Sequence, residues 1–284
     1  MKTRNMLDFE PTRSLLYVDC ASEDYRVKLE NFLYKTHIPE SISMFQPYVS
    51  KYAFYSALPA PEGSERFGVQ RMQLTEHYWM CCPDNEKFFP HHKALSETFP
   101  PEVMVWQGFI PSLEALNQPM ETDDLRQDSD SQGGMKPLVF AFVPVWWEED
   151  FKGAGRTISD GPNYRWQFAI SYPDDAKEAG DEWLLHEFIP AFVDCDETTR
   201  ILSSKVIKEA SGSPFDRIVE MWFEDPSSWK RAVEKASLKV KKPEWAQTSD
   251  FPYVPAIYGI QCVFVSDIAR SDNLTQYHGY ITMR

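Results

Sequence analysis

Two strand-like runs, each closed by a proline, carry an ionisable side chain two residues before a tryptophan. LTEHYWMCC contains His77 and Trp79, and IVEMWFED contains Glu220 and Trp222. When the two prolines are aligned, His77 falls on Glu220 and the tryptophans coincide. A ring that stacks on a substrate, beside a group whose pKa burial can shift, suits acid–base chemistry on a flat aromatic compound.

Strand alternation predicts which face each of these residues occupies. In the second run the odd-numbered residues are apolar and suit packing under helices, so Ile218, Glu220 and Trp222 are expected to face the interior of the fold. By the same count, the inward residues of the first run are Thr75, His77, Trp79 and Cys81. The alternative is that His77 and Glu220 only pair with each other or with backbone groups across that interior.

A histidine also ends a helix-like segment in the first half of the chain. FLYKTHIPES (residues 32–41) and WLLHEFIPAF (residues 183–192) share an aromatic-Leu-x-x-x-x-Ile-Pro pattern, which fits a helix that packs in the same way twice. Only the first copy reads His-Ile-Pro, so His37 makes the first cavity the better candidate for an active site. A cation at a helix C-terminus is also favourable for stability alone. His186 is expected to bind substrate in the second cavity.

Three tyrosines and an arginine follow that first helix, namely Tyr48, Tyr52, Tyr55 and Arg71. A phenol can donate a proton to a developing oxyanion, and a guanidinium can hold a carboxylate in a bidentate manner. Tyr48 is expected to act in catalysis, whereas Tyr52, Tyr55 and Arg71 are expected to bind the substrate with the two tryptophans. Packing is the alternative role of each tyrosine in so aromatic a chain.

The elements that would position these residues occur in the same order twice. In the first half they are a strand (14–21), a helix (22–37), an extended stretch (47–58), a strand (74–82), a helix (84–99) and a strand (102–110). In the second half they are a strand (164–173), a helix (181–193), two strands (199–210 and 216–225), a helix (227–236) and a strand (255–267). This βαββαβ order predicts an α+β fold of two tandem ferredoxin-like repeats. Their antiparallel sheets would pack their bare faces together as an intramolecular α/β barrel.

The repeats set the expected domain boundaries. Residues 1–116 form the first repeat, residues 117–162 an acidic linker with an extra strand, and residues 163–284 the second repeat with a C-terminal tail. The linker is polar and ends in glycines, as mobile segments do. The strand KPLVFAFVPVWW within it belongs to neither repeat, and it suits an added edge strand, a lid or a contact in a homodimer.

Composition excludes several classes of function. A net charge of -14 opposes binding to a nucleic-acid backbone. No run of eighteen apolar residues and no apolar leader is present, which predicts neither a membrane span nor a secretory signal. Five cysteines without a CxxC spacing favour free thiols in the cytoplasm. No nucleotide, haem or metal signature is present, so chemistry without a cofactor or metal is expected.

The strand and helix order, the His-Ile-Pro sequence and the phrase VEMWFEDPSSWKRA (residues 219–232) resemble the dimeric α/β-barrel superfamily and, within it, the EthD-like proteins, here as a tandem fusion. The resemblance covers both halves but not the linker, the extra strand or the tail. It implies a substrate cavity in or beside each barrel, often with a histidine from the first helix. Members include quinol monooxygenases, isomerases, cyclases and haem enzymes, so the fold alone selects no activity.

The favoured function is a cofactor-independent enzyme that acts on a small aromatic or phenolic compound. The expected catalytic residues are His37, His77, Tyr48 and Glu220, and the expected substrate-binding residues are Tyr52, Tyr55, Arg71, Trp79, His186 and Trp222. A lyase step such as decarboxylation or elimination is the first choice, and isomerisation or cyclisation is its near neighbour. The alternatives are a cofactor-free quinol monooxygenase, a non-catalytic binding protein for an apolar molecule, and a haem protein.

Overall fold

The structure is a computed structural model. It describes residues 12–20, 26–27, 30, 35, 38–39, 49–69, 71–79, 135–156, 160–206, 215–256, 260–266 and 271–272.

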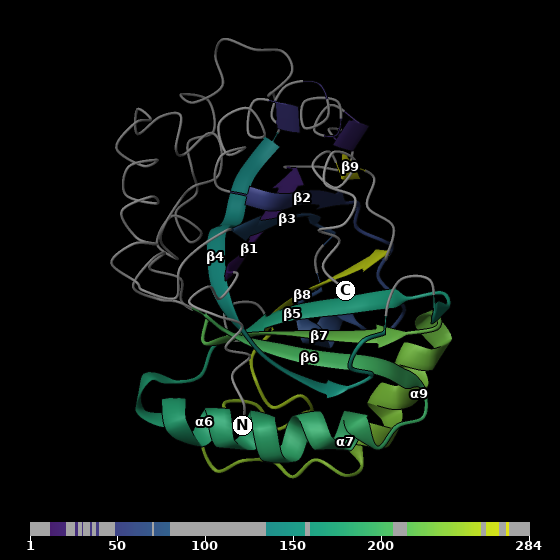
Figure 1. The fold of residues 1–284 in the computed structure, drawn as a ribbon. Helices are drawn as coiled ribbons and strands as arrows, with labels where there is room; N and C mark the ends of the chain where they lie inside the picture. Colours follow the sequence, from purple (N-terminus) through teal and green to yellow (C-terminus); the bar gives the residue numbers. More distant parts are fainter. Residues whose placement is uncertain are drawn as a thin grey trace.

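Nine strands form a single antiparallel sheet in the order β8-β5-β7-β6-β4-β1-β3-β2-β9 (Figure 1). Their bounds are β1 (Thr12–Cys20), β2 (Val49–Tyr55), β3 (Gln73–Trp79), β4 (Met135–Lys152), β5 (Tyr164–Ile170), β6 (Thr198–Val206), β7 (Arg217–Phe223), β8 (Ile260–Ser266) and β9 (Ser271–Asp272). The order contains two groups of four, β4-β1-β3-β2 and β8-β5-β7-β6. In each group the strand that comes fourth in the chain lies beside the first, as in a ferredoxin-like sheet. The α+β, antiparallel character predicted from the sequence is therefore confirmed.

The closed barrel predicted from the sequence is not what the described strands form. They make an open series that runs from β8 to β9. In this part of the chain, the ladder between the two margins is reduced to an isolated antiparallel bridge between Ala57 and Val265, supported by a hydrogen bond from the Leu58 N–H to the Phe264 carbonyl at 2.7 Å.

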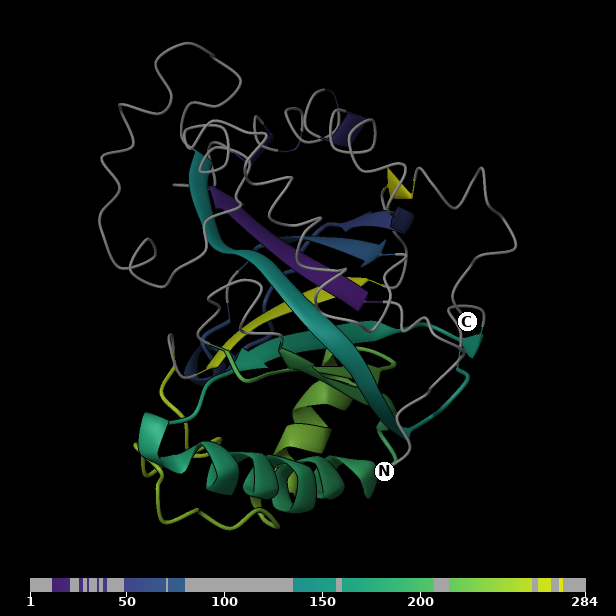
Figure 2. The same cartoon turned by 60° about the vertical axis from the view of Figure 1, so that its left-hand side comes forward.

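Strand β4 connects the two groups. It is 18 residues long, and its early part pairs with β1 whereas its later part pairs with β6. Figure 2 shows β4 crossing the face of the molecule from one group to the other. The segment KPLVFAFVPVWW was predicted to be an edge strand, a lid or a dimer contact outside both repeats. That prediction is wrong, because the segment has a strand on each side and is the fourth strand of the first group. The strand predicted at residues 102–110 lies outside the described residues.

Helices cover the outer face of the second group (Figure 1). They are α6 (Lys177–Trp183), a π-helical turn (Leu184–Phe188), α7 (Ile189–Val193) and α9 (Pro226–Ser237), with short 3₁₀ turns at Glu65–Phe67 and Asp174–Ala176. The two helices predicted for the second half are thus present. Within the described ranges, no helix combines the length and the apolar character that a membrane crossing requires.

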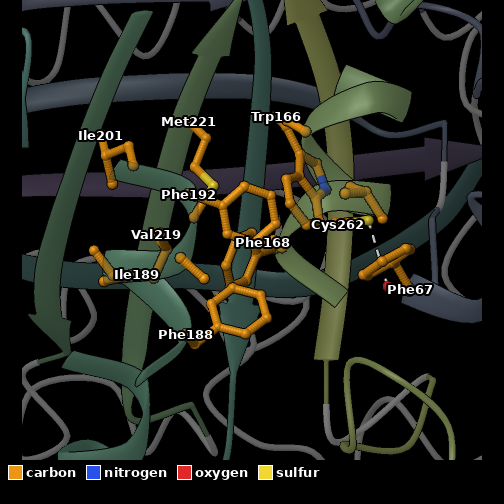
Figure 3. Packing of buried hydrophobic residues seen from close by; sticks show 14 of the residues in the cluster. Phe67, Trp166, Phe168, Phe188, Ile189, Phe192, Ile201, Val219, Met221 and Cys262 are labelled. Atoms are coloured by element: carbon orange, nitrogen blue, oxygen red, sulfur yellow. Dashed lines mark hydrogen bonds between the residues drawn. The ribbon is translucent and has the colours of Figure 1, made fainter. Parts of the chain in front are cut away.

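Aromatic side chains fill the layer between these helices and the second group of strands. Trp166 and Phe168 stack at 4.7 Å between ring centroids, and Phe188 lies 5.2 Å from Phe192. Phe67, from the first half of the chain, packs edge-on against Trp166 at 5.2 Å, and all five rings are at most 1% exposed. Each buried aromatic side chain stabilises the fold by roughly 1.5–3 kcal/mol through removal from water. Figure 3 shows the density of this packing.

Asp225 caps the N-terminus of α9, and its loss is a testable case of local stability. Its carboxylate accepts a hydrogen bond from the Ser228 N–H at 2.7 Å, and Pro226 occupies the first turn. Hydrogen bonding to the backbone at Ser228 holds the pKa of Asp225 below its usual value. Asp225→Ala is expected to cost about 0.5–2 kcal/mol in urea denaturation at neutral pH. Because the folded-state pKa is depressed, the cost should disappear as the pH falls through that pKa. Asp225→Asn should keep the cap at all pH values, and an equal cost for both variants would contradict the capping account.

Candidate functional site

Four buried charges meet in the interior between the two groups of strands. Arg165, on β5, reaches Glu76 on β3 at 3.0 Å and Glu220 on β7 at 2.9 Å. Arg13, on β1, lies 3.8 Å from Glu76 and 3.5 Å from Glu220. Each arginine therefore faces both carboxylates, and each group of strands supplies one arginine and one glutamate. All four side chains are at most 6% exposed, and we call this set the charge quartet.

The quartet keeps its members ionised. Burial alone would raise the pKa of Glu220, but the guanidinium groups of Arg165 and Arg13 hold that pKa well below its usual range. Burial likewise opposes ionisation of Arg165, but the carboxylates of Glu220 and Glu76 raise the pKa of Arg165 well above its usual value. A carboxylate so stabilised is a poor proton acceptor at neutral pH. The expected role of Glu220 as a catalytic acid or base does not fit this environment.

Hydrogen bonds extend the quartet to neighbouring polar groups. The Gln167 amide donates to Glu220 at 3.0 Å and accepts from the Tyr17 hydroxyl. The Trp222 indole N–H donates to Glu220. Burial raises the pKa of Tyr17 well above its usual value, so this phenol stays neutral. The result is a connected polar network in which the carboxylate oxygens of Glu220 are occupied by donors from several strands.

Guanidinium groups cover the two aromatic rings that were predicted to bind substrate in this interior. The Arg165 guanidinium carbon lies 4.6 Å from the Tyr55 ring centroid, and that of Arg200 lies 4.8 Å from the Trp222 ring centroid. Arg200 is itself paired with Asp150 at 3.1 Å. These are cation–π contacts within the protein, so Tyr55 and Trp222 form part of the packing around the quartet.

The inward face of β7 follows the prediction, but that of β3 does not. Ile218 packs in the interior cluster, whereas Val219 packs beneath the helices. On β3 the interior residues are Leu74 and Glu76, one position away from the predicted set that began with Thr75. The alignment on the two prolines is therefore wrong by one residue. The shared Glu-x-aromatic phrases, EHY and EMW, are the sequence signal that gives the correct alignment.

The ladder pairings then define corresponding positions on the opposite face of each group. With Glu76 matched to Glu220, His77 corresponds to Met221. In the second group, Met221 lies in a row with Trp166 on β5 and Ile201 on β6. All three are 0% exposed core residues, and Figure 3 shows them side by side across the three strands. The equivalent row in the first group is Ser14, His77 and Tyr52.

This row, which we call the polar row, is the main chemical difference between the two groups. Three apolar core positions of the second group are occupied in the first by a serine, a histidine and a tyrosine. Gln73, on the same face of β3 as position 77, donates a hydrogen bond to Glu30 at 3.2 Å, so this face meets the segment predicted as the first helix. Polar residues at positions that otherwise form a core lower stability, which makes the polar row a candidate functional site.

The other predicted site residues are placed as follows. Tyr52 is fully buried, Arg71 is exposed, and His186 is exposed on the second group's helices, 3.3 Å from Glu182. For His77 and Trp79 only the backbone is described, and His37 and Tyr48 lie outside the described residues. The structure thus brings the positions of Tyr52 and His77 together as directly paired neighbours on β2 and β3. Over the ranges that the structure describes, no group of three or more potential metal ligands was found.

Comparison with known families gives one match, to the chalcone isomerase N-terminal domain over residues 9–112. This is less than half of the chain, but it includes all of the polar row. No curated protein matches the chain significantly.

Several solved structures have a similar course of the chain at 8% sequence identity. An anthrone oxidase-like protein has a TM-score of 0.46 over 94% of this chain and 98% of its own. Chlorite dismutase from Candidatus Nitrospira defluvii has a TM-score of 0.44 over 92% and 93%. A major regulator of staphylococcal pathogenesis has a TM-score of 0.38 over 90% and 99%. These scores carry no argument about function, and the fold description above rests on the strand order.

Proposed function

We propose that the chain is a cofactor-independent isomerase that cyclises a phenolic enone, a compound of the chalcone class, at the polar row of the first group. The observation that carries the proposal is the replacement of Trp166, Met221 and Ile201 by Ser14, His77 and Tyr52 at corresponding positions. The match to the chalcone isomerase N-terminal domain supports the choice of substrate class.

Cyclisation of such a compound needs only proton transfers. A phenol oxygen loses its proton and adds to the β-carbon of the conjugated ketone, forming one C–O bond. The electron pair of the C=C bond moves to the carbonyl oxygen as an enolate, which then takes a proton at the α-carbon. Atoms and electrons balance without an oxidant or reductant. The protein must therefore supply a base, a donor for the enolate oxygen and an acid, which are roles that side chains can fill.

The polar row has residue types for each of these roles. His77 would take the phenol proton and return it to the α-carbon, and Tyr52 would donate a hydrogen bond to the developing enolate oxygen. His37, from the first half as well, is the alternative base, with Tyr48 as a second phenol and Arg71 as a cation for an anionic substrate. A lyase acting on a phenolic acid would use the same groups, but it would release carbon dioxide or another fragment.

The architecture supports a duplicated unit with one specialised half. Strand β4 extends from the first group to pair with β6, and β9, which follows β8 in the chain, pairs with β2. Each group thus lends its last strand to the second strand of the other, as two fused subunits of a dimer would. In the second group the layer under the helices is filled by aromatic side chains. We infer that the second group is a scaffold and the first holds the site.

The test is direct turnover of a hydroxylated 2′-hydroxychalcone, followed as loss of its visible absorption. A cyclase should give a flavanone of one enantiomer, and in D₂O it should place one deuterium on the α-carbon. Spontaneous cyclisation gives a racemate, so a racemic product formed at the buffer rate would refute the proposal. Release of carbon dioxide from a phenolic acid would instead support the lyase.

A further inference from the structure

We propose that the Thr75 hydroxyl is a ligand-binding group of this site and donates a hydrogen bond to the substrate's carbonyl oxygen. The inference rests on the proposed function and adds a residue that determines binding. Thr75 lies on β3 between Leu16 of β1 and Phe54 of β2. It is 0% exposed, and its Oγ1 has no hydrogen-bond partner. A buried hydroxyl without a partner has lost its water and gained nothing in return.

The second group shows what an optimised core places at this position. Thr75 corresponds to Val219, which pairs with Phe168 and Ser203 and is a 0% exposed member of the core under the helices. Valine and threonine have nearly the same shape, so the first group differs there by a hydroxyl in place of a methyl. The hydroxyl is therefore not needed to fill the space.

The position of Thr75 suits recognition of the molecule on which His77 would act. Alternate residues of a strand share a face and lie about 7 Å apart, so Gln73, Thr75 and His77 occupy one face of β3. The Gln73 side chain is already engaged, because it donates to Glu30 and accepts from the Ala57 N–H at 3.1 Å. Thr75 is thus the buried donor on this face of β3 that has no bond within the protein. A ketone that extends along the strand from His77 would meet it.

The experiment compares Thr75→Val with Thr75→Ser in two assays, flavanone binding by calorimetry and thermal unfolding. Thr75→Val is expected to weaken flavanone binding about tenfold, the effect of one lost hydrogen bond, while the unfolding midpoint stays unchanged or rises. Thr75→Ser should bind within about twofold of the parent protein because it keeps the donor. Thr198→Val is the matched control, since Thr198 is also 0% exposed and without a partner but lies on β6 of the second group. It should leave binding unchanged.

The outcomes separate this inference from the proposed function. If the parent protein cyclises the chalcone and Thr75→Val binds flavanone equally well, the role of Thr75 is wrong and the function stands. If the parent protein does not turn over chalcone but Thr75→Val still weakens flavanone binding, the function is wrong and the binding role stands. A lower unfolding midpoint for Thr75→Val but not for Thr198→Val would show a structural role, and absence of any flavanone binding would overturn both.

Discussion

The Arg165→Met variant is expected to lose about 3–5 kcal/mol of unfolding free energy, measured by urea denaturation at neutral pH. Arg165 contacts both carboxylates of the charge quartet at 3.0 and 2.9 Å, whereas Arg13 is farther from each. Without Arg165, Glu76 and Glu220 would share a single, more distant guanidinium in an interior that excludes water. Removing one member of a buried charge network leaves its partners uncompensated, and that accounts for the size of the effect.

Arg231→Met provides the control for that variant. Arg231 lies on the surface, 53% exposed and 3.6 Å from Glu197, so its loss should cost no more than about 1 kcal/mol. Replacing all four members of the quartet by apolar residues of similar volume should recover much of the stability lost in Arg165→Met, because no buried charge is then left unpaired. Equal losses for Arg165→Met and Arg231→Met would show that the quartet contributes nothing specific.

The penalty of Arg165→Met should also depend on pH. The pKa of Glu220 in the folded protein lies well below its usual range, so the stabilisation from its ionised form is complete above the ordinary glutamate pKa of about 4.3. It is lost as the pH falls from there through the folded-state pKa. The difference between the parent protein and Arg165→Met should therefore be largest at neutral pH and shrink in acid. A difference that grows in acid would contradict the assignment of an ionised Glu220.

His77→Ala is expected to lower the turnover number for chalcone cyclisation by about 10²–10⁴, the usual contribution of a positioned general acid or base. His77 would transfer the proton in both steps, so the loss should appear in kcat more than in KM. His77→Met places in the first group the residue that stands at the corresponding position of the second, and should be as inactive as His77→Ala without loss of stability.

His186→Ala is the matched histidine control for the turnover measurement. His186 is 68% exposed on the helices of the second group, and the proposal gives it no part in catalysis. It should retain the parent rate. If both histidine variants retain that rate, His77 is not the base, and the same measurement on His37→Ala would then decide between the two candidates of the first half.

Local patterns were sufficient for the features that depend on neighbouring residues in the sequence. The inward placement of Ile218, Glu220 and Trp222 followed from alternation along one strand, because the apolar odd-numbered positions identified the face that packs under helices. The helix that begins after Asp225 followed from its cap and from Pro226. Each inference uses an interaction that spans only a few residues, so the sequence contains all of its terms.

The register between distant strands required the tertiary structure. Alignment on the prolines after each run was wrong by one residue, since a proline marks a strand's end in the loop and not the distance from its centre. The correct match of Glu76 to Glu220 appears only when both carboxylates meet Arg13 and Arg165, and Arg13 bonds Glu220 from 207 positions away. Likewise, nothing local in KPLVFAFVPVWW shows that it pairs with β1 and β6 at once.

By itself, then, the sequence determined the element types, the α+β class, the face of β7 that turns inward and the residue types available for proton transfer. Tertiary structure decided which of them share a site. It placed Glu220 in a charge network where its low pKa makes it unsuitable as a base, and it set Ser14, His77 and Tyr52 in one row on the other face. The physical reason is that a shift of one residue exchanges the two faces of a strand, and only long-range packing fixes that register.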